Sequence, residues 1–474
     1  MSIDLKSLTI RNTHDHLKAG DFSVMELVES CVKNIEKENP ELNAFLEIFD
    51  DWKNQTEEAQ EFFRSGQADF LTGIPIAVKD NILIEGKICS AGSKILENYR
   101  AVYDSTVASK LKKRKSILLG RTNMDEFAMG SSTENSAYGL SRNPLDKERV
   151  PGGSSGGSAV AVAMGGSLGA LGSETAGSVR QPASFCGLVG LKPTYGSVSR
   201  YGLIALGSSL DQIGPFAKTV GDIEILFDAI KGHDPLDATT AKVLGSDSLP
   251  KDLVIGVPRD ILSQPGIDKE VLKNFEDSIA RLSKLGFHIK DISLPHTSYS
   301  LAVYYIIMPA EVSSNLARFD GVKYGLRKEG ENLLDEYVKT RTSGFGKEPR
   351  RRIILGTYVL STGYYDAFYN KANLVRNLII DDFEKVFADG VHLVATPTTP
   401  TEAFKIGEKA NNPLSMYMSD LLTAPANIAG LPAISLPSGF TEKNKMPLGL
   451  QFIAPNFRED MLFEAGKRFL GEND

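Results

Sequence analysis

A long segment rich in glycine, serine and alanine, from Asn123 to about Pro215, constrains the fold of this chain more than any other feature. Its densest part runs from Pro151 to Ser158 and reads Pro-Gly-Gly-Ser-Ser-Gly-Gly-Ser. Such residues let backbones approach closely and adopt positive φ angles. A flexible linker has a similar composition, but the apolar run from Ala159 to Met164 that follows is typical of a buried helix. We therefore expect this segment to be packed inside the protein.

Apolar patterns on both sides of this segment predict an α/β fold. The residues from Ser23 to Glu38 have the spacing of an amphipathic helix, with Ser23 as its N-cap. A strand, a helix and a second strand follow one another from Leu253 to Ile292, which implies a parallel or mixed sheet. Further predicted elements are helices over 52–65, 353–383 and 458–470, and strands over 71–79 and 392–396. We interpret residues 1–474 as one large domain, with a helical N-terminal segment over about 1–65, a core over about 71–215 and a weak candidate linker over 232–249.

The composition argues against several classes of protein. The net charge of −7 and the pI of about 5.6 give no overall attraction to the phosphates of nucleic acid. The three cysteines, Cys31, Cys89 and Cys186, lack the spacing of a disulfide framework or a metal site, which favours a reducing cytoplasm. No apolar run approaches about 18 residues and no signal peptide is recognisable, so we expect neither export nor a membrane span.

Three polar residues stand out as candidates for catalysis: Lys79 at the end of an apolar strand, Ser154 in the double-glycine loop, and Ser178 in the run Gly172–Arg180. Their arrangement resembles the amidase signature family, whose mark is such a Gly/Ser-rich segment with a lysine well upstream. Ser154 follows Lys79 by 75 residues and Ser178 follows Ser154 by 24, and both separations match the family. The resemblance implies the amidase signature fold, in which a large mixed central β-sheet is covered by helices on both faces.

The resemblance also implies a serine–serine–lysine mechanism. Ser178 would be the nucleophile, and Ser154, preceded by a cis peptide bond, would stand between it and Lys79. A serine hydroxyl needs an adjacent base to take its proton, so Lys79 must be neutral. Burial in a poorly solvated site lowers the pKa of a lysine by several units, and the apolar run from Ile74 to Val78 supplies such a setting.

The loop before the nucleophile is expected to stabilise negative charge. The backbone N–H groups of Thr175, Ala176, Gly177 and Ser178 would form the oxyanion hole. The chain departs from the family pattern in two places, because Glu174 stands where aspartate is common and Ala176 where glycine is common. The alanine is tolerable there only if its φ angle is negative. A subunit that is catalytically weakened and acts mainly as a scaffold is therefore one alternative.

Longer stretches resemble one group within this family, the glutamine-hydrolysing A subunits of aspartyl/glutamyl-tRNA amidotransferases. They cover residues 123–136, 318–322, 352–357 and 363–366. This resemblance implies that glutamine is hydrolysed and that ammonia passes through an internal tunnel to a partner, which amidates glutamate or aspartate misattached to tRNA. Subunits B and C are the implied partners, and tRNA, ATP and Mg²⁺ are expected mainly at the partner subunit. No cofactor or metal is expected in this chain itself.

Glutamine is a zwitterion, so its site needs a cation for the α-carboxylate and an anion for the α-ammonium. The resemblance assigns the first role to Arg352 and the second to Asp420. Arg352 ends a run of three arginines, so a slip by one residue is an alternative. The remaining expected substrate contacts are Tyr304, Met129, Gly130 and Ser131.

Other motifs are weaker. The run from Gly152 to Gly156 also fits the G-x-S-x-G nucleophile elbow of α/β-hydrolases, but none of the six histidines lies in a distinctive glycine or acidic context. The S-x-x-K match over Ser109–Lys112 lacks its companion motifs. No nucleotide-binding motif is present. A stand-alone amidase that acts on another small amide is the main alternative to the glutaminase.

Overall fold

One central sheet organises the protein. The computed structural model describes residues 3–242 and 248–472. Its 11-stranded sheet has parallel and antiparallel neighbours, which confirms the predicted mixed sheet. The strands follow one another across the sheet in the order β1 (Phe45–Ile48), β3 (Ile117–Thr122), β2 (Pro75–Lys79), β4 (Gly169–Glu174), β6 (Gln212–Ala217), β5 (Val189–Lys192), β10 (Ala433–Phe440), β11 (Pro447–Ile453), β9 (Leu393–Pro397), β7 (Val254–Pro258) and β8 (His288–Ile292).

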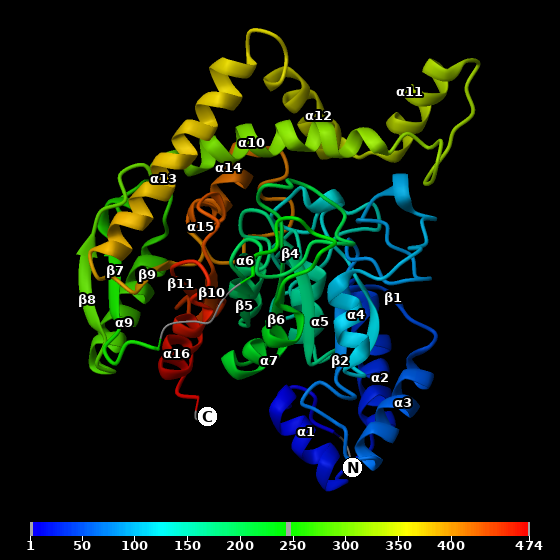
Figure 1. Cartoon of the computed structure of the whole chain (residues 1–474), viewed down its shortest axis with the longest axis vertical. Coiled ribbons are helices and arrows are strands. Elements are labelled where there is room, and N and C mark those ends of the chain that lie inside the picture. Colours follow the sequence, from blue (N-terminus) through cyan, green and yellow to red (C-terminus); the bar gives the residue numbers. More distant parts are fainter. Residues whose placement is uncertain (1–2, 243–247, 473–474) are drawn as a thin grey trace.

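Helices surround this sheet (Figure 1). α10, α12 and α13 lie across the top of the view, α11 projects beyond them, and α1, α2 and α3 gather near the N-terminus. The helices are α1 (Ile10–Ala19), α2 (Val24–Leu42), α3 (Trp52–Arg64), α4 (Thr106–Lys113), α5 (Gly156–Ala163), α6 (Arg180–Cys186), α7 (Val220–Ile230), α8 (Arg259–Leu262), α9 (Lys269–Lys284), α10 (Ser300–Asn315), α11 (Leu333–Gly344), α12 (Lys347–Val359), α13 (Lys371–Ala388), α14 (Pro413–Tyr417), α15 (Ala424–Ile428) and α16 (Glu459–Leu470).

The register of β10 and β11 shows that both faces of the sheet are covered. Gly449 on β11 lies against Ser184 of α6. The next residue, Leu450, pairs with Leu436, which lies beside Gly466 of α16. Because neighbouring residues of a strand point to opposite faces, α6 and α16 cover opposite faces of the sheet. The fold is therefore the predicted α/β arrangement.

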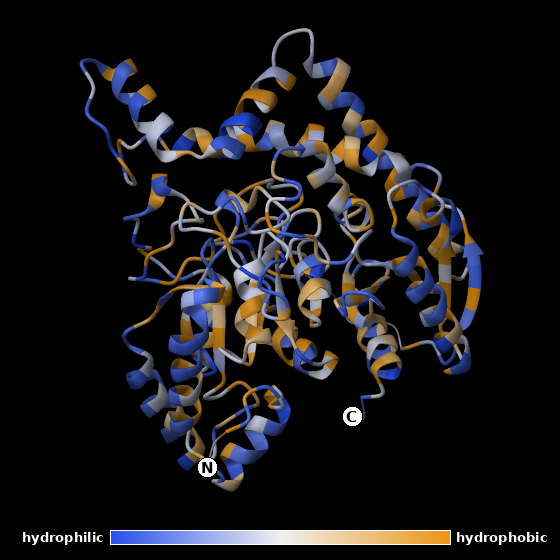
Figure 2. Cartoon of the chain, turned by 180° about the vertical axis from the view of Figure 1, so that it is seen from behind, coloured by the Kyte–Doolittle hydropathy of each residue, from blue (hydrophilic) through white to orange (hydrophobic). Residues whose placement is uncertain are grey.

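Several helices form where the sequence predicts them. Ser23 caps α2 through a capping box with Glu26. α2 and α3 alternate hydrophilic and hydrophobic residues along their length (Figure 2). α5 is buried along nearly all of its length, which rules out a flexible linker at this point in the chain. The unit β7–α9–β8 is present, and its two strands pair in parallel.

Two segments differ from the sequence-based expectation or fall partly outside the described residues. The stretch over 353–383 is mostly helical, as predicted, but it is interrupted, because α12 ends at Val359 and a π-helical turn, Tyr365–Asn370, precedes α13. Gly363, with φ of 85°, lies in this break. The candidate linker over 232–249 falls partly outside the described residues. Across the described part of the chain, no helix is long and apolar enough to cross a membrane.

Candidate active site

The parallel strands β2 and β4 bring the candidate base and the glycine-rich loop together. They pair directly, with Val78 opposite Leu171, so their carboxyl ends lie at the same edge of the sheet. β2 ends at Lys79 and β4 ends at Glu174. The loop that leaves β4 and the start of α5 therefore converge on the lysine.

Lys79 is fully buried and forms three hydrogen bonds. Its Nζ donates to Ser154 Oγ at 2.8 Å, to Ser155 Oγ at 2.7 Å and to the Ser173 carbonyl oxygen at 3.1 Å. Burial lowers the pKa of Lys79 from 10.5 to about 7, although the charges of Asp125, Asp211 and Glu174 oppose the shift. A lysine with this pKa is partly neutral near pH 7, and a neutral amine can accept a proton.

Ser154 is held in a closely packed turn. The Gly153–Ser154 peptide bond is cis, as the family resemblance implies. A Cβ atom at Gly153 would lie 2.2 Å from an oxygen of Asp125, so only glycine fits there. The Gly153 N–H donates to Gln181 Oε1 at 2.8 Å, and Gln181 Nε2 donates to the Ser131 carbonyl oxygen at 2.9 Å. Gln181 thus joins the Ser154 turn to a predicted substrate-binding residue.

Ser178 lies beside this turn, where its carbonyl oxygen accepts from the Ser155 N–H at 3.2 Å. The residue is 8% exposed, and its hydroxyl makes none of the hydrogen bonds found among the described residues. Within the same part of the chain, the N–H groups of Ala176, Gly177 and Ser178 donate to no loop, cap or side-chain acceptor. The Ser178 hydroxyl and these three N–H groups are therefore available to a substrate.

The two departures from the family pattern are accommodated. Ala176 is not among the described residues with positive φ, and it packs into an apolar cluster. Gly177 has φ of +151°, and a Cβ atom there would lie 2.4 Å from Thr423 Oγ1. Glu174 Oε2 accepts from the backbone N–H groups of Val179 and Arg180 at 3.0 Å each. The longer acid therefore fixes the backbone directly after Ser178.

Two further acidic groups shape the site. Asp211 Oδ1 accepts from the Thr175 hydroxyl at 2.7 Å, and burial raises the pKa of Asp211 to about 6. Asp125 accepts from the N–H groups of Thr133 at 2.8 Å and Asn135 at 3.0 Å, which fixes the loop after Ser131. The sequence-based interpretation assigned no role to Gln181, Asp125 or Asp211. In the sequence, these three residues are distinguished only by lying in the glycine-rich segment, and Asp125 also lies in the 123–136 stretch.

The structure distinguishes between the three adjacent arginines. Arg352 is 3% exposed, whereas its two predecessors in the chain point to solvent. Its Nε donates to Glu348 Oε1 at 2.8 Å, and its Nη1 lies 3.3 Å from Met308 Sδ. Successive residues of a helix point about 100° apart, so only one of the three can face inward. Arg352 is that residue.

Asp420 lies close to two residues of the predicted substrate set. It is buried, and its Oδ1 accepts from the Ser131 hydroxyl at 3.0 Å. Its Oδ2 accepts from the Tyr305 hydroxyl at 2.9 Å. Tyr304, the tyrosine predicted as a contact, is also buried, and its ring meets that of Tyr305 edge-on with centroids 4.8 Å apart. Tyr305 was missed because no local pattern separates it from its neighbour.

Two of the predicted substrate contacts, Arg352 and Gly130, line a small cavity of about 130 Å³. Tyr417, Ser132 and Lys409 also line it. The Ser132 hydroxyl is buried and has no partner among the described residues. The lining contains carboxylates as well as cations, because Glu134 and Glu348 contribute to it beside Arg352 and Lys409.

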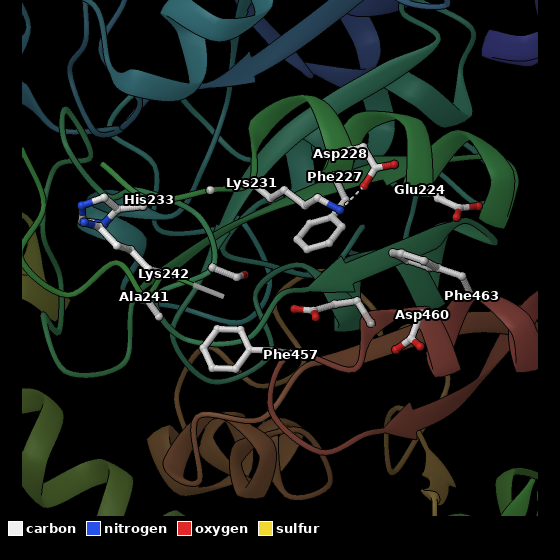
Figure 3. Close-up of a pocket in the computed structure, with 13 residues that line it drawn as sticks. Glu224, Phe227, Asp228, Lys231, His233, Ala241, Lys242, Phe457, Asp460 and Phe463 are labelled. Atoms are coloured by element: carbon white, nitrogen blue, oxygen red, sulfur yellow. Dashed lines mark ion pairs between the residues drawn. The ribbon is translucent and has the colours of Figure 1, made fainter. Parts of the chain in front are cut away.

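A wider cavity of about 590 Å³ lies elsewhere, between α7, the start of α16 and the segment after Lys231 (Figure 3). Its labelled side chains include the aromatic rings of Phe227 and Phe463 and an ion pair between Lys231 and Asp228, at 2.5 Å. None of the predicted site residues lines it. We assign it no part in the chemistry.

Comparison with known proteins agrees with this geometry. The family model Amidase matches residues 26–463. The A subunit of glutamyl-tRNA(Gln) amidotransferase from Thermodesulfovibrio yellowstonii is 52% identical over 464 residues, with 96% of this chain and 95% of that protein covered. The crystal structure of the A subunit of glutamyl-tRNA(Gln) amidotransferase from Thermotoga maritima superposes with a TM-score of 0.78 at 42% identity, covering 99% of this chain and 94% of that one.

A more distant neighbour has a different substrate. The structure of 6-aminohexanoate cyclic dimer hydrolase complexed with substrate has a TM-score of 0.84 at 28% identity and covers 99% of this chain and 98% of that one. The fold is thus shared by amide hydrolases of several kinds. This chain belongs to the amidase signature family and, within it, to the family of the glutamyl-tRNA(Gln) amidotransferase A subunits.

Proposed function

We propose that this chain is the glutaminase subunit of a tRNA-dependent amidotransferase and that it hydrolyses glutamine to glutamate and ammonia. The observation that carries the proposal is the pairing of two sets of residues. Lys79 and Ser154 are hydrogen-bonded beside Ser178, and a buried arginine, Arg352, and a buried aspartate, Asp420, both contact Tyr305. The first set supports cleavage of an amide, and the second matches the charges of a free amino acid.

In this mechanism Ser178 Oγ attacks the carboxamide carbon of glutamine. Its proton passes to Ser154 Oγ, whose own proton passes to the neutral Nζ of Lys79. The backbone N–H groups of Ala176 and Gly177, with those of Thr175 and Ser178, receive the oxyanion. Collapse of the tetrahedral intermediate returns the proton through Ser154 to the leaving nitrogen, which departs as ammonia. Water then hydrolyses the glutamyl ester on Ser178 and restores its hydroxyl.

Substrate recognition follows from charge. Arg352 binds the α-carboxylate of glutamine and Asp420 binds its α-ammonium, because a buried charge requires an opposite partner. Tyr304, Met129 and Gly130, with the backbone of Ser131, complete the pocket. An amide without both charges leaves one of these buried groups unpaired and binds more weakly.

The ammonia has a further acceptor in this proposal. Partner subunits B and C receive it and amidate glutamate, or aspartate, attached to tRNA, while tRNA, ATP and Mg²⁺ bind mainly at the partner. The names of the relatives support a multi-subunit enzyme. A net charge of −7 on this chain fits a tRNA held by the partner. The proposed location is the cytoplasm.

One assay tests the function. The full chain is purified alone and with its partner subunits, and ammonia release from glutamine and transfer to Glu-tRNA are measured. Glutaminase activity that rises with the partners supports the proposal, and Ser178→Ala should abolish it. Turnover of unrelated amides without response to glutamine would point to a stand-alone amidase. No turnover in any setting would favour a scaffold subunit.

A further inference from the structure

Tyr305, on α10, contacts both charged residues of the proposed glutamine pocket. Its hydroxyl donates to Asp420 Oδ2 at 2.9 Å. The guanidinium of Arg352 lies over its ring, 5.4 Å from the centroid. One side chain therefore connects the proposed ammonium site, near the start of α15, with the proposed carboxylate site on α12.

A second aromatic ring extends this connection. Tyr417 stacks on Tyr305 with centroids 3.7 Å apart and planes at 22°. The guanidinium of Arg352 also lies 5.6 Å from the centroid of Tyr417. The Tyr417 hydroxyl lies 3.4 Å from Glu348 Oε1, the same oxygen that accepts from Arg352 Nε. The guanidinium thus lies beside both stacked rings, nearly equidistant from their centroids, and has a carboxylate at its edge.

We propose that Tyr305 is a positioning residue that fixes the separation of Arg352 and Asp420 and keeps Asp420 ionised for the α-ammonium of glutamine. This inference rests on the proposed function, because it deepens the account of the same pocket. The hydroxyl acts on the aspartate and the ring acts on the arginine. Removal of the hydroxyl alone should therefore affect one end of the substrate and not the other.

The ionisation of Asp420 depends on groups from several elements. Burial raises its pKa to about 6, while the hydrogen bonds from Tyr305 and Ser131 and the charge of Arg352 lower it. The charge of Glu174 raises it further. Lys409 and Tyr304 are further ionisable groups that interact with this carboxylate. Loss of the Tyr305 hydrogen bond moves the pKa of Asp420 upward, so a larger fraction is neutral between pH 6 and 7 and cannot pair with an ammonium group.

The test uses Tyr305→Phe, which keeps the ring and removes the hydroxyl. Glutamine binding is measured by calorimetry from pH 5.5 to 8.5 in the full chain assembled with its partner subunits, with Ser178→Ala present to prevent turnover. We expect the pH at which glutamine binding is half lost to move upward by roughly half a unit to one unit, which raises Kd for glutamine about three- to eightfold at pH 5.5. Glutaramate lacks the α-amino group. Its Kd for the Tyr305→Phe protein should therefore stay within about twofold of its Kd for the protein with Tyr305.

Two comparisons separate this role from a merely structural one. Tyr299→Phe, at the exposed start of the same helix, is the matched control and should leave both ligands unaffected. Thermal unfolding of each variant reports whether the fold is intact. Tyr305→Leu, which removes the ring beside Arg352 as well as the hydroxyl, should weaken glutaramate too, and glutamine by a larger factor.

The outcomes are distinct. Equal weakening of glutamine and glutaramate by Tyr305→Phe, or a pH profile that superimposes on that of the Tyr305 protein, would overturn the inference. If the protein with Ser178 intact releases no ammonia from glutamine, the proposed function fails instead. If it does release ammonia and Tyr305→Phe changes nothing, only the positioning role of Tyr305 fails.

Discussion

At the scale of single residues, burial decides the chemistry of this site. Lys79 has no exposed surface, and its pKa is lowered to about 7 because water cannot solvate the ammonium form. Arg352 and Asp420 are almost as buried, yet each has a polar partner that stabilises its charge. The same physical effect thus neutralises a base at one end of the pocket and leaves two charged groups at the other.

The first prediction concerns the pH dependence of catalysis. Because the neutral form of Lys79 accepts the proton, kcat for glutamine should rise with pH and level off above about 7. Lys79→Arg, which stays protonated, should lower kcat at least about a hundredfold and remove this rise. Steady-state ammonia release from pH 5.5 to 9 measures kcat and its pH dependence for the original protein and for Lys79→Arg. Asp420 should act on KM, so a kcat profile independent of pH would contradict the role of Lys79.

The second prediction compares two neighbouring positions of the oxyanion loop. Gly177→Ala places a Cβ atom 2.4 Å from Thr423 Oγ1 at a φ that alanine rarely adopts, so the loop must shift. We expect kcat to fall about a hundredfold, comparable to the loss of one oxyanion donor. Ala176→Gly is the control, since Ala176 shows no positive φ, and should keep kcat within about threefold. Similar losses for both variants would argue against this assignment of the loop.

At the scale of elements, the start of α12 is anchored by a residue from a distant segment. Glu126 accepts from the Gly346 N–H at 2.9 and 3.1 Å and from the Ser93 hydroxyl. Gly346 is the N-cap of α12 and has no side chain to cap the helix itself. Because α12 carries Arg352, this anchor also sets the position of the proposed carboxylate site. Burial raises the pKa of Glu126 to about 7.

The third prediction follows from this anchor. Glu126→Ala leaves the Gly346 N–H and the Ser93 hydroxyl without a buried acceptor, so the protein should lose about 1–3 kcal/mol of stability and its KM for glutamine should rise. Glu126→Gln keeps an amide oxygen as acceptor, so most of the stability and a KM near the original value should be retained. Urea unfolding measures the stability of the two variants, and glutaminase kinetics measure their KM. If the alanine variant matches the original protein in both, α12 is positioned by other contacts.

At the scale of the whole molecule, one buried ion pair connects distant parts of the sheet. Arg180 and Glu174 are both fully buried and bonded to each other. The Arg180 guanidinium also donates to Gln451 on β11 and to Asn427 on α15. Burial raises the pKa of Glu174, but the charge and hydrogen bonds of Arg180 and the charge of Lys192 together outweigh it and hold that pKa below the ordinary value. The catalytic loop is thereby attached to the C-terminal strands.

The fourth prediction tests this connection. Arg180→Met leaves the Glu174 carboxylate buried without a counter-charge, which should cost about 3–5 kcal/mol of stability. The double variant Glu174→Gln with Arg180→Met removes both charges and should recover part of that loss. Urea unfolding of the two single variants and the double variant gives the coupling between them. Additive effects would show that the two residues do not act as a pair.

The sequence alone determined the parts of this protein that depend on local pattern. The N-cap at Ser23, the strand that ends at Lys79 and the buried α5 follow from residue type and spacing. The candidate catalytic residues could be named because their separations match a family. These features depend on neighbours in the chain or on fixed intervals, and both can be counted in a sequence.

The tertiary structure decided what lies between distant segments. Tyr305 meets Asp420 across 115 positions, Glu126 meets Gly346 across 220, and Arg180 meets Gln451 across 271. No local pattern marks such pairs, because they form only when the strand order of the sheet brings their elements together. Which of three adjacent arginines faces inward is likewise decided by the packing of α12 on its neighbours. The sequence therefore supplied the chemical groups, and the packing of the sheet and its helices selected which of them meet.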